Sequence, residues 1–333
     1  MGTPGRVKLA DVAARAGVSV ATVSKVVNGR YGVAKETIAA VQEIIDELGY
    51  VGNLGASGLR SSRTNVLGIL VADFEPYSAE LIKGAARVTR NTQYDVLSYA
   101  GGEVPAWERR SLARLGGTLI DAAVVVTPTS LDTAISVPVV AVDPHYGPHW
   151  LPTIDCDSFG GSRTATQHLI DLGHRRLAFL GGRQELDSSQ LREAGFREAL
   201  RLAQLPVNEE LVRHSRYDPD TALQIAVELL SLPEPPTAIV VANDVTAMRV
   251  VEAAHQLGLN VPRDLSVVGF DDIPDAALCD PPLTTVRQPL QDMGAAAMTM
   301  LLDILEGREH EHHIRMDVEL VVRSSTAAPR SGA

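Results

Sequence analysis

The sequence predicts an α/β protein with a small all-helical N-terminal headpiece and a larger core of two doubly wound parallel-sheet subdomains. Apolar residues recur at helical spacing over the first 50 residues, whereas short β-branched runs alternate with helical stretches from Val66 onward. The 333 residues are too many for one ordinary core. Hydrophobic residues make up 45% of the chain and aromatic residues only 4%, so we expect Val, Leu, Ile and Ala to fill the interior.

Three short helices are expected in the headpiece, around a core small enough for a helix-turn-helix domain. Gly17 can end the first helix, Ser19 is placed to cap the second, Asn28-Gly29 breaks the second, and Gly49 ends the third. The apolar stripes that would form the small core are Leu9, Val12, Ala13 and Ala16 in the first helix, Val23 and Val27 in the second, and Ile38, Val41, Ile45 and Leu48 in the third.

The core is expected to consist of βαβ units with parallel sheets, because its strand-like runs alternate with helical stretches. These runs lie at 66–71, 95–100, 123–127, 137–143, 176–182, 238–244 and 265–271. Polar residues stand at the ends of three of them: Asp143, Asn243 with Asp244, and Asp271 with Asp272. Since ligands of open parallel sheets bind beyond the carboxyl ends of the strands, these residues are candidates for a ligand site.

The charge distribution separates the two parts. Residues 1–64 carry eight Lys/Arg and five Asp/Glu, a net charge of +3, whereas the rest of the chain carries −14. A basic head on an acidic body is expected when only one module contacts phosphate. No apolar run approaches the roughly 18 residues of a membrane helix, and the N-terminus has no apolar signal region, so we expect a cytoplasmic protein. Cys156 and Cys279 lack CxxC spacing and should be reduced structural thiols.

The N-terminal segment carries the most specific motif. LADVAARAGVSVATVSKVVNG (9–29), followed by VAKETIAAVQEIIDELGY (33–50), resembles the helix-turn-helix of the lactose-repressor (LacI/GalR) family. The resemblance implies that the second helix enters the major groove of operator DNA. Family members usually carry Arg at the position of Lys25, and Lys lacks the bidentate fork of Arg. The implied DNA contacts in this segment are Leu9, Ser19, Val20, Ala21, Thr22, Ser24, Lys25 and Asn28.

The linker VGNLGASGLRSSRT (51–64) resembles the hinge helix of the same family, which inserts a Leu into the minor groove. The matching DNA contacts would be Asn53, Ala56 and the wedge residue Leu59. Gly55 and Gly58 each cost ~1 kcal/mol in a helix, so the hinge should be less helical off DNA than is typical. A plain flexible linker is the alternative interpretation.

Residues 66–323 resemble the periplasmic-binding-protein-like core of the family. The strongest strings are HLIDLGHRRLAFLGG (168–182), TAIVVANDVTAM (237–248) and VPRDLSVVGFDDIPDAALCDPPLTTVRQPLQDMG (261–294), and the weakest stretch is 72–135. The effector contacts that the resemblance implies are Asp143, Ser188, Arg192, Tyr217, Asn243 and Asp271, with Asp73 and Tyr77 as further candidates in the first loop of the cleft. Asp244 and Asp272 are expected to be helix caps instead.

The expected domains are a headpiece at 1–52, a hinge at 53–64, a core at 65–326 and a loose tail at 327–333. The N-terminal subdomain of the core would comprise about 65–157 and 287–317, and the C-terminal subdomain about 158–286 and 318–326. The residues after Arg323 show no heptad pattern, so a homodimer is expected rather than a tetramer.

The predicted function is a DNA-binding transcriptional repressor that a small sugar releases from a near-palindromic operator. A corepressor-type regulator that responds to a purine or a protein, or a sugar-binding protein without a DNA function, is the alternative. No catalytic or nucleotide-binding motif is present, so neither an enzyme nor a cofactor is predicted. Glu311, among His310, His312 and His313, is read as part of a surface loop rather than a metal site, and His174 as structural.

Overall fold

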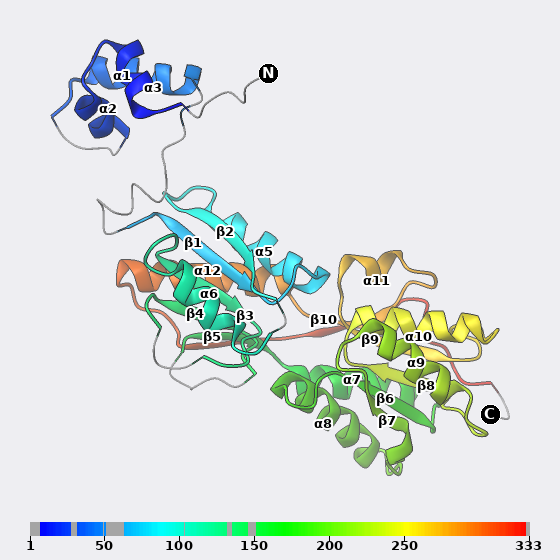
Figure 1. Cartoon of the computed structure of the whole chain (residues 1–333). Helices are drawn as coiled ribbons and strands as arrows, with labels where there is room; N and C mark the ends of the chain where they lie inside the picture. The colour runs from blue at the N-terminus through cyan, green and yellow to red at the C-terminus, as the bar shows by residue number, and fades with distance from the viewer. Residues whose placement is uncertain are drawn as a thin grey trace. The chain divides into compact units, whose positions relative to one another are not determined.

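A computed structural model describes residues 7–27, 32–48, 50, 63–102, 104–131, 135–145 and 151–330. The chain divides into two compact units (Figure 1). The first unit comprises Met1–Asn65 with Gly117–Asp121 and contains the headpiece helices. The second unit comprises Val66–Gly116 with Ala122–Ala333 and is called the core below.

The headpiece contains three helices around a very small apolar interior: α1 (Leu9–Ala16), α2 (Val20–Val27) and α3 (Lys35–Leu48). Gly17 ends α1 with a left-handed φ of 63°, which glycine adopts without steric cost. Ser19 caps α2 as predicted, because its Oγ accepts the Thr22 N–H at 3.1 Å. The buried apolar residues of the described headpiece are Val12, Ala13, Val23 and Val41.

Two expected core positions of the headpiece are wrong. Val27 and Ile38 are 38% and 40% exposed. Val26, rather than Val27, packs beside the buried Val23, so the apolar stripe of α2 follows the i, i+3 row. In α3 the apolar contacts continue from Val41 to Ile44, Ile45 and Leu48, toward the C-terminal end of the helix and away from Ile38. The predicted contacts Asn28, Asn53, Ala56 and Leu59 lie outside the described residues.

The core contains two six-stranded sheets, which confirms the predicted α/β architecture. The first has the order β11-β5-β4-β3-β1-β2 with every pair parallel, and the second has the order β12-β10-β9-β8-β6-β7 with only β12 antiparallel. The strands of the first sheet are β1 (Val66–Val71), β2 (Asp95–Ala100), β3 (Ala122–Val126), β4 (Val139–Val142), β5 (Thr153–Cys156) and β11 (His313–Met316). Those of the second are β6 (Leu177–Gly181), β7 (Val212–His214), β8 (Ala238–Val241), β9 (Ser266–Asp271), β10 (Thr284–Arg287) and β12 (Glu319–Val321).

Helices connect and cover these strands (Figure 1). With the first sheet come α5 (Pro76–Thr89), α6 (Trp107–Leu115) and α12 (Leu290–Glu306); α12 packs on β3, β4 and β5 and against α5. With the second sheet come α7 (Ser158–Asp171), α8 (Asp187–Leu202), the 3-10 turn η1 (Glu209–Leu211), α9 (Pro219–Leu230), α10 (Asp244–Gln256) and α11 (Pro274–Leu278). Among the residues that the structure describes, no helix is long and apolar enough to span a membrane.

The chain passes between the two sheets three times: between β5 and α7, between β10 and α12, and between β11 and β12. The first and third crossings touch, because the Asp157 N–H donates to the Met316 carbonyl at 3.2 Å. Five strands, β5, β7, β10, β11 and β12, were not among the predicted runs. They are only three or four residues long and carry polar or charged residues, as in HIRM (313–316), so they lack the apolar run that marks the longer strands.

The C-terminal segment up to Arg330 is bound to the core and is not the loose tail that was predicted. The Ala327 carbonyl accepts from His174 at 2.9 Å, and the Ala327 N–H donates to Ser266 Oγ at 3.0 Å. His174 is 1% exposed, and its other ring nitrogen is 2.8 Å from Thr237 Oγ1. Buried polar atoms of His174 and Ser266 thus bind this backbone, a constraint that the composition of residues 327–330 does not reveal.

Candidate functional site

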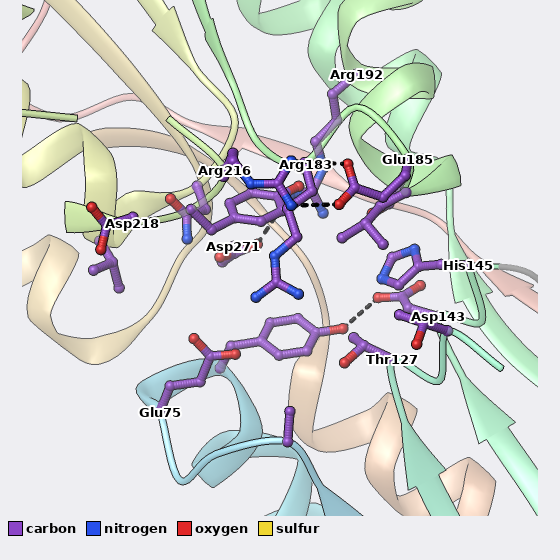
Figure 2. A pocket seen from close by; sticks show the side chains of 18 of the residues that line it. Glu75, Thr127, Asp143, His145, Arg183, Glu185, Arg192, Arg216, Asp218 and Asp271 are labelled. Atoms are coloured by element: carbon purple, nitrogen blue, oxygen red, sulfur yellow. Dashed lines mark hydrogen bonds and ion pairs between the residues drawn. The ribbon is translucent and has the colours of Figure 1, made fainter. Parts of the chain in front are cut away.

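A cavity of about 490 Å³ lies in the core, among loops at the carboxyl ends of strands from both sheets (Figure 2). Tyr77 on α5, Thr127 after β3 and Asp143 after β4 line it from the first sheet. Arg192 on α8, Asn243 after β8 and Asp271 at the end of β9 line it from the second. Parallel strands bring the loops at their carboxyl ends together, which explains why residues so distant in sequence meet here.

The structure brings together most of the predicted effector residues. Those that line the cavity are Tyr77, Asp143, Ser188, Arg192, Tyr217, Asn243 and Asp271. Asp73 does not line it: this residue is exposed, and its carboxylate accepts the N–H of Phe74 at 2.7 Å. Glu75, two residues later, lines the cavity in its place. Whether these side chains bind an effector remains a prediction.

Arg192 and Asp271 form a buried ion pair on the cavity floor. Arg192 Nη1 lies 3.8 Å from Asp271 Oδ1, and both side chains are 6% exposed. The guanidinium lies over the Phe270 ring, 3.9 Å from its centroid, and Nη1 donates to the Ala242 carbonyl at 2.5 Å. Burial raises the pKa of Asp271, whereas the charge of Arg192 and the hydrogen bond from Gln288 Nε2 at 2.6 Å lower it. Burial by itself would lower the pKa of Arg192, but its anionic surroundings keep the group charged.

Tyr77 and Asp143 form a second polar pair on the wall contributed by the first sheet. The Tyr77 hydroxyl donates to Asp143 Oδ2. Burial and the nearby Asp143 raise the pKa of Tyr77 well above its ordinary value, so the phenol keeps its proton. Burial also raises the pKa of Asp143, against the opposing effects of the Tyr77 hydrogen bond and the charge of Arg192. The cavity therefore offers buried donors and acceptors from both sheets.

Left-handed backbone conformations are concentrated around the cavity. Of the non-glycine residues with positive φ, the ones that line it are Thr127 (47°), Asp143 (46°), Arg216 (59°), Tyr217 (64°) and Asp271 (116°). Such conformations cost free energy and persist where the surroundings impose them, most often at binding and catalytic sites. Gly182 supports one of them, because a Cβ at this position would meet the Tyr217 ring at 2.1 Å.

Two of the polar residues at strand ends behave differently from the prediction. Asn243, not Asp244, caps α10, since its Oδ1 accepts the Thr246 N–H at 3.1 Å. Asp244 is completely buried and accepts from Thr285 Oγ1 at 2.5 Å and from the Ile273 N–H at 3.0 Å, so it holds β10 and the β9 loop together. Asp272 is also not a cap: its carboxylate accepts from Arg287 and Arg323, each at 2.6 Å.

Several cavity residues carried no signal in the sequence. Val104, Pro105 and Trp107 lie in the stretch where the family resemblance is weakest. Figure 2 shows Arg183, Glu185 and Arg216 on one wall, facing Glu75 on the other. Arg216 Nη2 contacts Glu185 Oε1 at 2.6 Å, and both side chains are exposed. The remaining lining residues are Ala72, Thr129, His145, Leu186, Asp218, Pro219 and Val245.

In the headpiece, the predicted DNA contacts of α2 divide into exposed and half-buried side chains. Val20 is 48% exposed, Ala21 and Lys25 are exposed, and Thr22 and Ser24 are half-buried. Ser19 Oγ and Thr22 Oγ1 lie 2.8 Å apart, so part of the hydrogen-bonding capacity of Thr22 is used within the helix N-terminus. Leu9 is partly buried against the headpiece core. These assignments also remain predictions.

The histidines near the C-terminus do not form a metal site in the described chain, where no group of three or more His, Cys, Asp or Glu side chains could hold a metal ion. Of these residues, His313 is not in a loop but begins β11, where its Nε2 lies 2.9 Å from Asp155 Oδ2.

Comparison with known proteins gives consistent matches over nearly all of the chain. Residues 8–53 match the model of bacterial regulatory proteins, lacI family, and residues 166–326 match the model of a periplasmic binding protein-like domain. The HTH-type transcriptional repressor PurR of Pectobacterium carotovorum subsp. carotovorum (strain PC1) is 34% identical, over 95% of this chain and 96% of that protein.

Two solved structures are similar over nearly all of the chain. A transcriptional regulator CelR–cellobiose complex is 31% identical with a TM-score of 0.72, covering 96% of this chain and 100% of that one. The lac repressor dimer bound to operator and the anti-inducer ONPF is 27% identical with a TM-score of 0.80, covering 97% and 100%. These proteins are transcriptional regulators rather than enzymes, as predicted for this chain.

Proposed function

Because this chain belongs to the lacI family of bacterial regulatory proteins, and is a DNA-binding repressor of that family, we propose that a small sugar bound in the core cavity releases it from its operator. The observation that carries the proposal is the presence of one pair of interacting polar side chains on each side of the cavity. Arg192 and Asp271 come from the subdomain of the second sheet, and Tyr77 and Asp143 from that of the first. One ligand that contacts both pairs would link the two subdomains.

The chemistry of the lining favours a neutral polyol. Carboxylates accept hydrogen bonds from sugar hydroxyls, Arg192 and the Asn243 amide donate to them, and the Tyr77 and Tyr217 rings offer flat apolar faces. The described lining residues include five carboxyl groups and three arginines, so the lining lacks the excess of cations that would favour an anion such as a sugar phosphate. A volume of about 490 Å³ is within the range of small-molecule sites. The similarity to the CelR–cellobiose complex also supports a sugar.

A purine is the second candidate, because the two tyrosine rings could equally stack on a flat heterocycle. In that case ligand binding would strengthen operator binding instead of weakening it.

For the sugar we propose induction, that is, release of the repressor from its operator when the sugar binds. A ligand that bridges the two subdomains favours their closed arrangement, and β1 follows the hinge directly in sequence, so closure would shift the hinge away from its DNA-bound state.

On DNA, we propose a homodimer on a near-palindromic site, with one α2 helix per half-site and the two hinges at the centre. The similarity to a lac repressor dimer bound to operator supports this assembly. Light scattering of the purified protein should give a dimer, and footprinting should give a site that is symmetric about its centre. A stable tetramer or an asymmetric footprint would contradict this part of the proposal.

The proposed response to a ligand is tested by titrating the protein–operator complex with cellobiose, lactose, glucose and hypoxanthine and measuring operator affinity. We expect one of the sugars to lower operator affinity, with a coupling of roughly 1–3 kcal/mol. The Arg192→Ala variant should bind operator like wild type but fail to respond, because the cavity is built entirely from core residues. A circular dichroism spectrum checks that the variant is folded. If Arg192→Ala responds normally, the cavity is not the effector site; if only hypoxanthine acts and strengthens binding, the ligand is of the second class.

A further inference from the structure

His145 lines the cavity, yet its side chain forms no hydrogen bond with any described residue. The residue is 3% exposed and lies two residues after Asp143, in the loop that follows β4. Its backbone N–H donates to the Pro128 carbonyl at 3.0 Å, which fixes this loop against the loop after β3. The ring atom Nδ1 is enclosed and has no partner. Figure 2 shows the ring next to Asp143, on the cavity wall.

The unpaired ring is unusual, because buried polar atoms are nearly always hydrogen-bonded. An unpaired one destabilises the protein and persists where it serves another purpose. Arg192 Nε is a second buried polar atom without a partner, and Arg192 lines the same cavity. The other atoms of this kind in the described chain belong to Glu108, Ser162 and His214, none of which lines the cavity. For His145 and Arg192, a small turn of the side chain toward a bound molecule would give the enclosed nitrogen a partner.

The charge state of His145 defines what this molecule must offer. Burial lowers the pKa of His145 to about 3, and the positive charges of Arg192 and Arg183 act in the same direction. Near neutral pH the ring is therefore uncharged, with one nitrogen donating and the other accepting. Arg192 can only donate, and an ionised carboxylate can only accept. His145 therefore differs from the charged groups of the cavity, as the neutral side chains of Ser188 and Asn243 also do.

We propose that His145 is a specificity-determining contact of the cavity, whose neutral ring hydrogen-bonds a hydroxyl group of the bound sugar. This inference rests on the proposed function, since it takes the ligand to be a polyol. A hydroxyl is the complementary group because one oxygen both donates and accepts, and so pairs with the ring in either tautomer. An analogue that lacks this hydroxyl leaves the ring unpaired and is rejected, as in other sites that recognise a hydroxyl by hydrogen bonding.

The proposal predicts effects of opposite sign on stability and on binding. His145→Phe replaces the unpaired polar ring with an apolar one, so the melting temperature of the ligand-free protein should rise. The same change removes the hydroxyl contact, so sugar affinity should fall roughly 10- to 100-fold. His145→Asn keeps a donor and an acceptor near Nδ1 and should recover part of the affinity. If His145 had only a structural role, replacing it would lower the melting temperature.

His214 provides a matched control. Its Nδ1 is also buried without a partner, but His214 does not line the cavity, and its Nε2 lies 3.5 Å from Glu193 Oε2. His214→Phe should leave sugar affinity unchanged. Comparing the two histidines separates a contact with the ligand from a general effect of exchanging a buried imidazole.

The experiment is thermal unfolding and calorimetric titration of the full-length protein, wild type and variants, with cellobiose, lactose, glucose and hypoxanthine as probes. If a sugar binds the wild type, Arg192→Ala loses it and His145→Phe binds it as tightly as wild type, the role of His145 is wrong while the proposed function stands. A lower melting temperature of ligand-free His145→Phe also overturns it. If no sugar binds the wild type, the proposed function fails, and the hydroxyl contact of His145 fails with it.

Discussion

The headpiece and the core handle charge in opposite ways. In the headpiece, the guanidinium of Arg15 lies 2.7 Å from the carboxylate of Glu47, and their side chains are 60% and 52% exposed, respectively. In the core, Arg192 and Asp271 are 3.8 Å apart, but both are 6% exposed. Removing one partner should cost less in the shorter pair, because water and salt screen exposed charges, whereas burial makes any unpaired charge costly. The headpiece thus keeps Arg15 accessible to solvent, whereas the core holds Arg192 in a buried, fixed position.

Removing Arg192 should have the largest effect on stability. At pH 8 we expect Arg192→Ala to lower the free energy of unfolding of the core by about 3–5 kcal/mol, because it leaves Asp271 buried without its cation. Burial already raises the pKa of Asp271, to about 7, and the charge of Arg192 opposes this shift. Without Arg192 the pKa rises further, and the carboxyl group can keep its proton instead of staying charged.

The sign of the pH dependence follows from that shift. A carboxyl group with a raised folded-state pKa destabilises the protein as pH rises from its unfolded pKa to its folded one, since the folded state binds the extra proton. The variant's deficit relative to wild type should therefore grow above pH 7 and be smaller at pH 5. Urea unfolding at each pH, followed by circular dichroism, measures this difference in the free energy of unfolding. In an Asp271→Asn background the additional loss above pH 7 should disappear, and a deficit independent of pH would contradict the assignment.

Elements encoded by local sequence patterns could be predicted from the sequence, whereas those that depend on tertiary contacts could not. The long β-branched runs such as VLGILV (66–71) predicted their strands, and the helix-turn-helix string predicted α1 to α3, because these elements are encoded by local patterns. Polar residues at strand ends, such as Asp143 and Asp271, predicted where a cavity would lie. Tertiary relations were missed. The short strand β11 exists because it pairs with β5, and nothing local marks it.

The cavity shows the same limit. Asp73 and Glu75 are acidic residues in one loop, and only the path of the backbone decides that Glu75 lines the cavity and Asp73 does not. Asn243 and Asp244 are equally good cap residues, and the choice between them depends on Thr285, forty-one residues further along the chain. The burial of His145 without a partner likewise arises from loops that meet in three dimensions.

In the headpiece, substitutions in α2 should have intermediate effects on operator binding. Thr22→Ala and Lys25→Ala should each weaken operator binding by roughly 1–3 kcal/mol if these residues contact bases. For Thr22 part of the loss would come from the α2 N-terminus, where its hydroxyl lies 2.8 Å from Ser19 Oγ. Fluorescence anisotropy at several salt concentrations separates the roles of Lys25: a phosphate contact lowers the salt slope by about 1, and a base contact relaxes specificity at one position. Unchanged affinity in both variants would exclude α2 as the reading helix.

The smallest effect is expected for the Arg15–Glu47 pair. Arg15→Ala should cost less than ~1 kcal/mol of headpiece stability, because both partners are more than half exposed and already well solvated. A double-mutant cycle with Glu47→Ala, measured by hydrogen exchange of the α1 and α3 amides, gives the coupling without the separate effects of each side chain. The coupling should fade at high salt, since exposed charges are screened. The equivalent cycle on Arg192 and Asp271 should be insensitive to salt, because that pair is buried. A coupling of several kcal/mol at Arg15–Glu47 that persists at high salt would mean that solvent exposure does not weaken this ion pair. The contrast between the headpiece and the core would then be wrong.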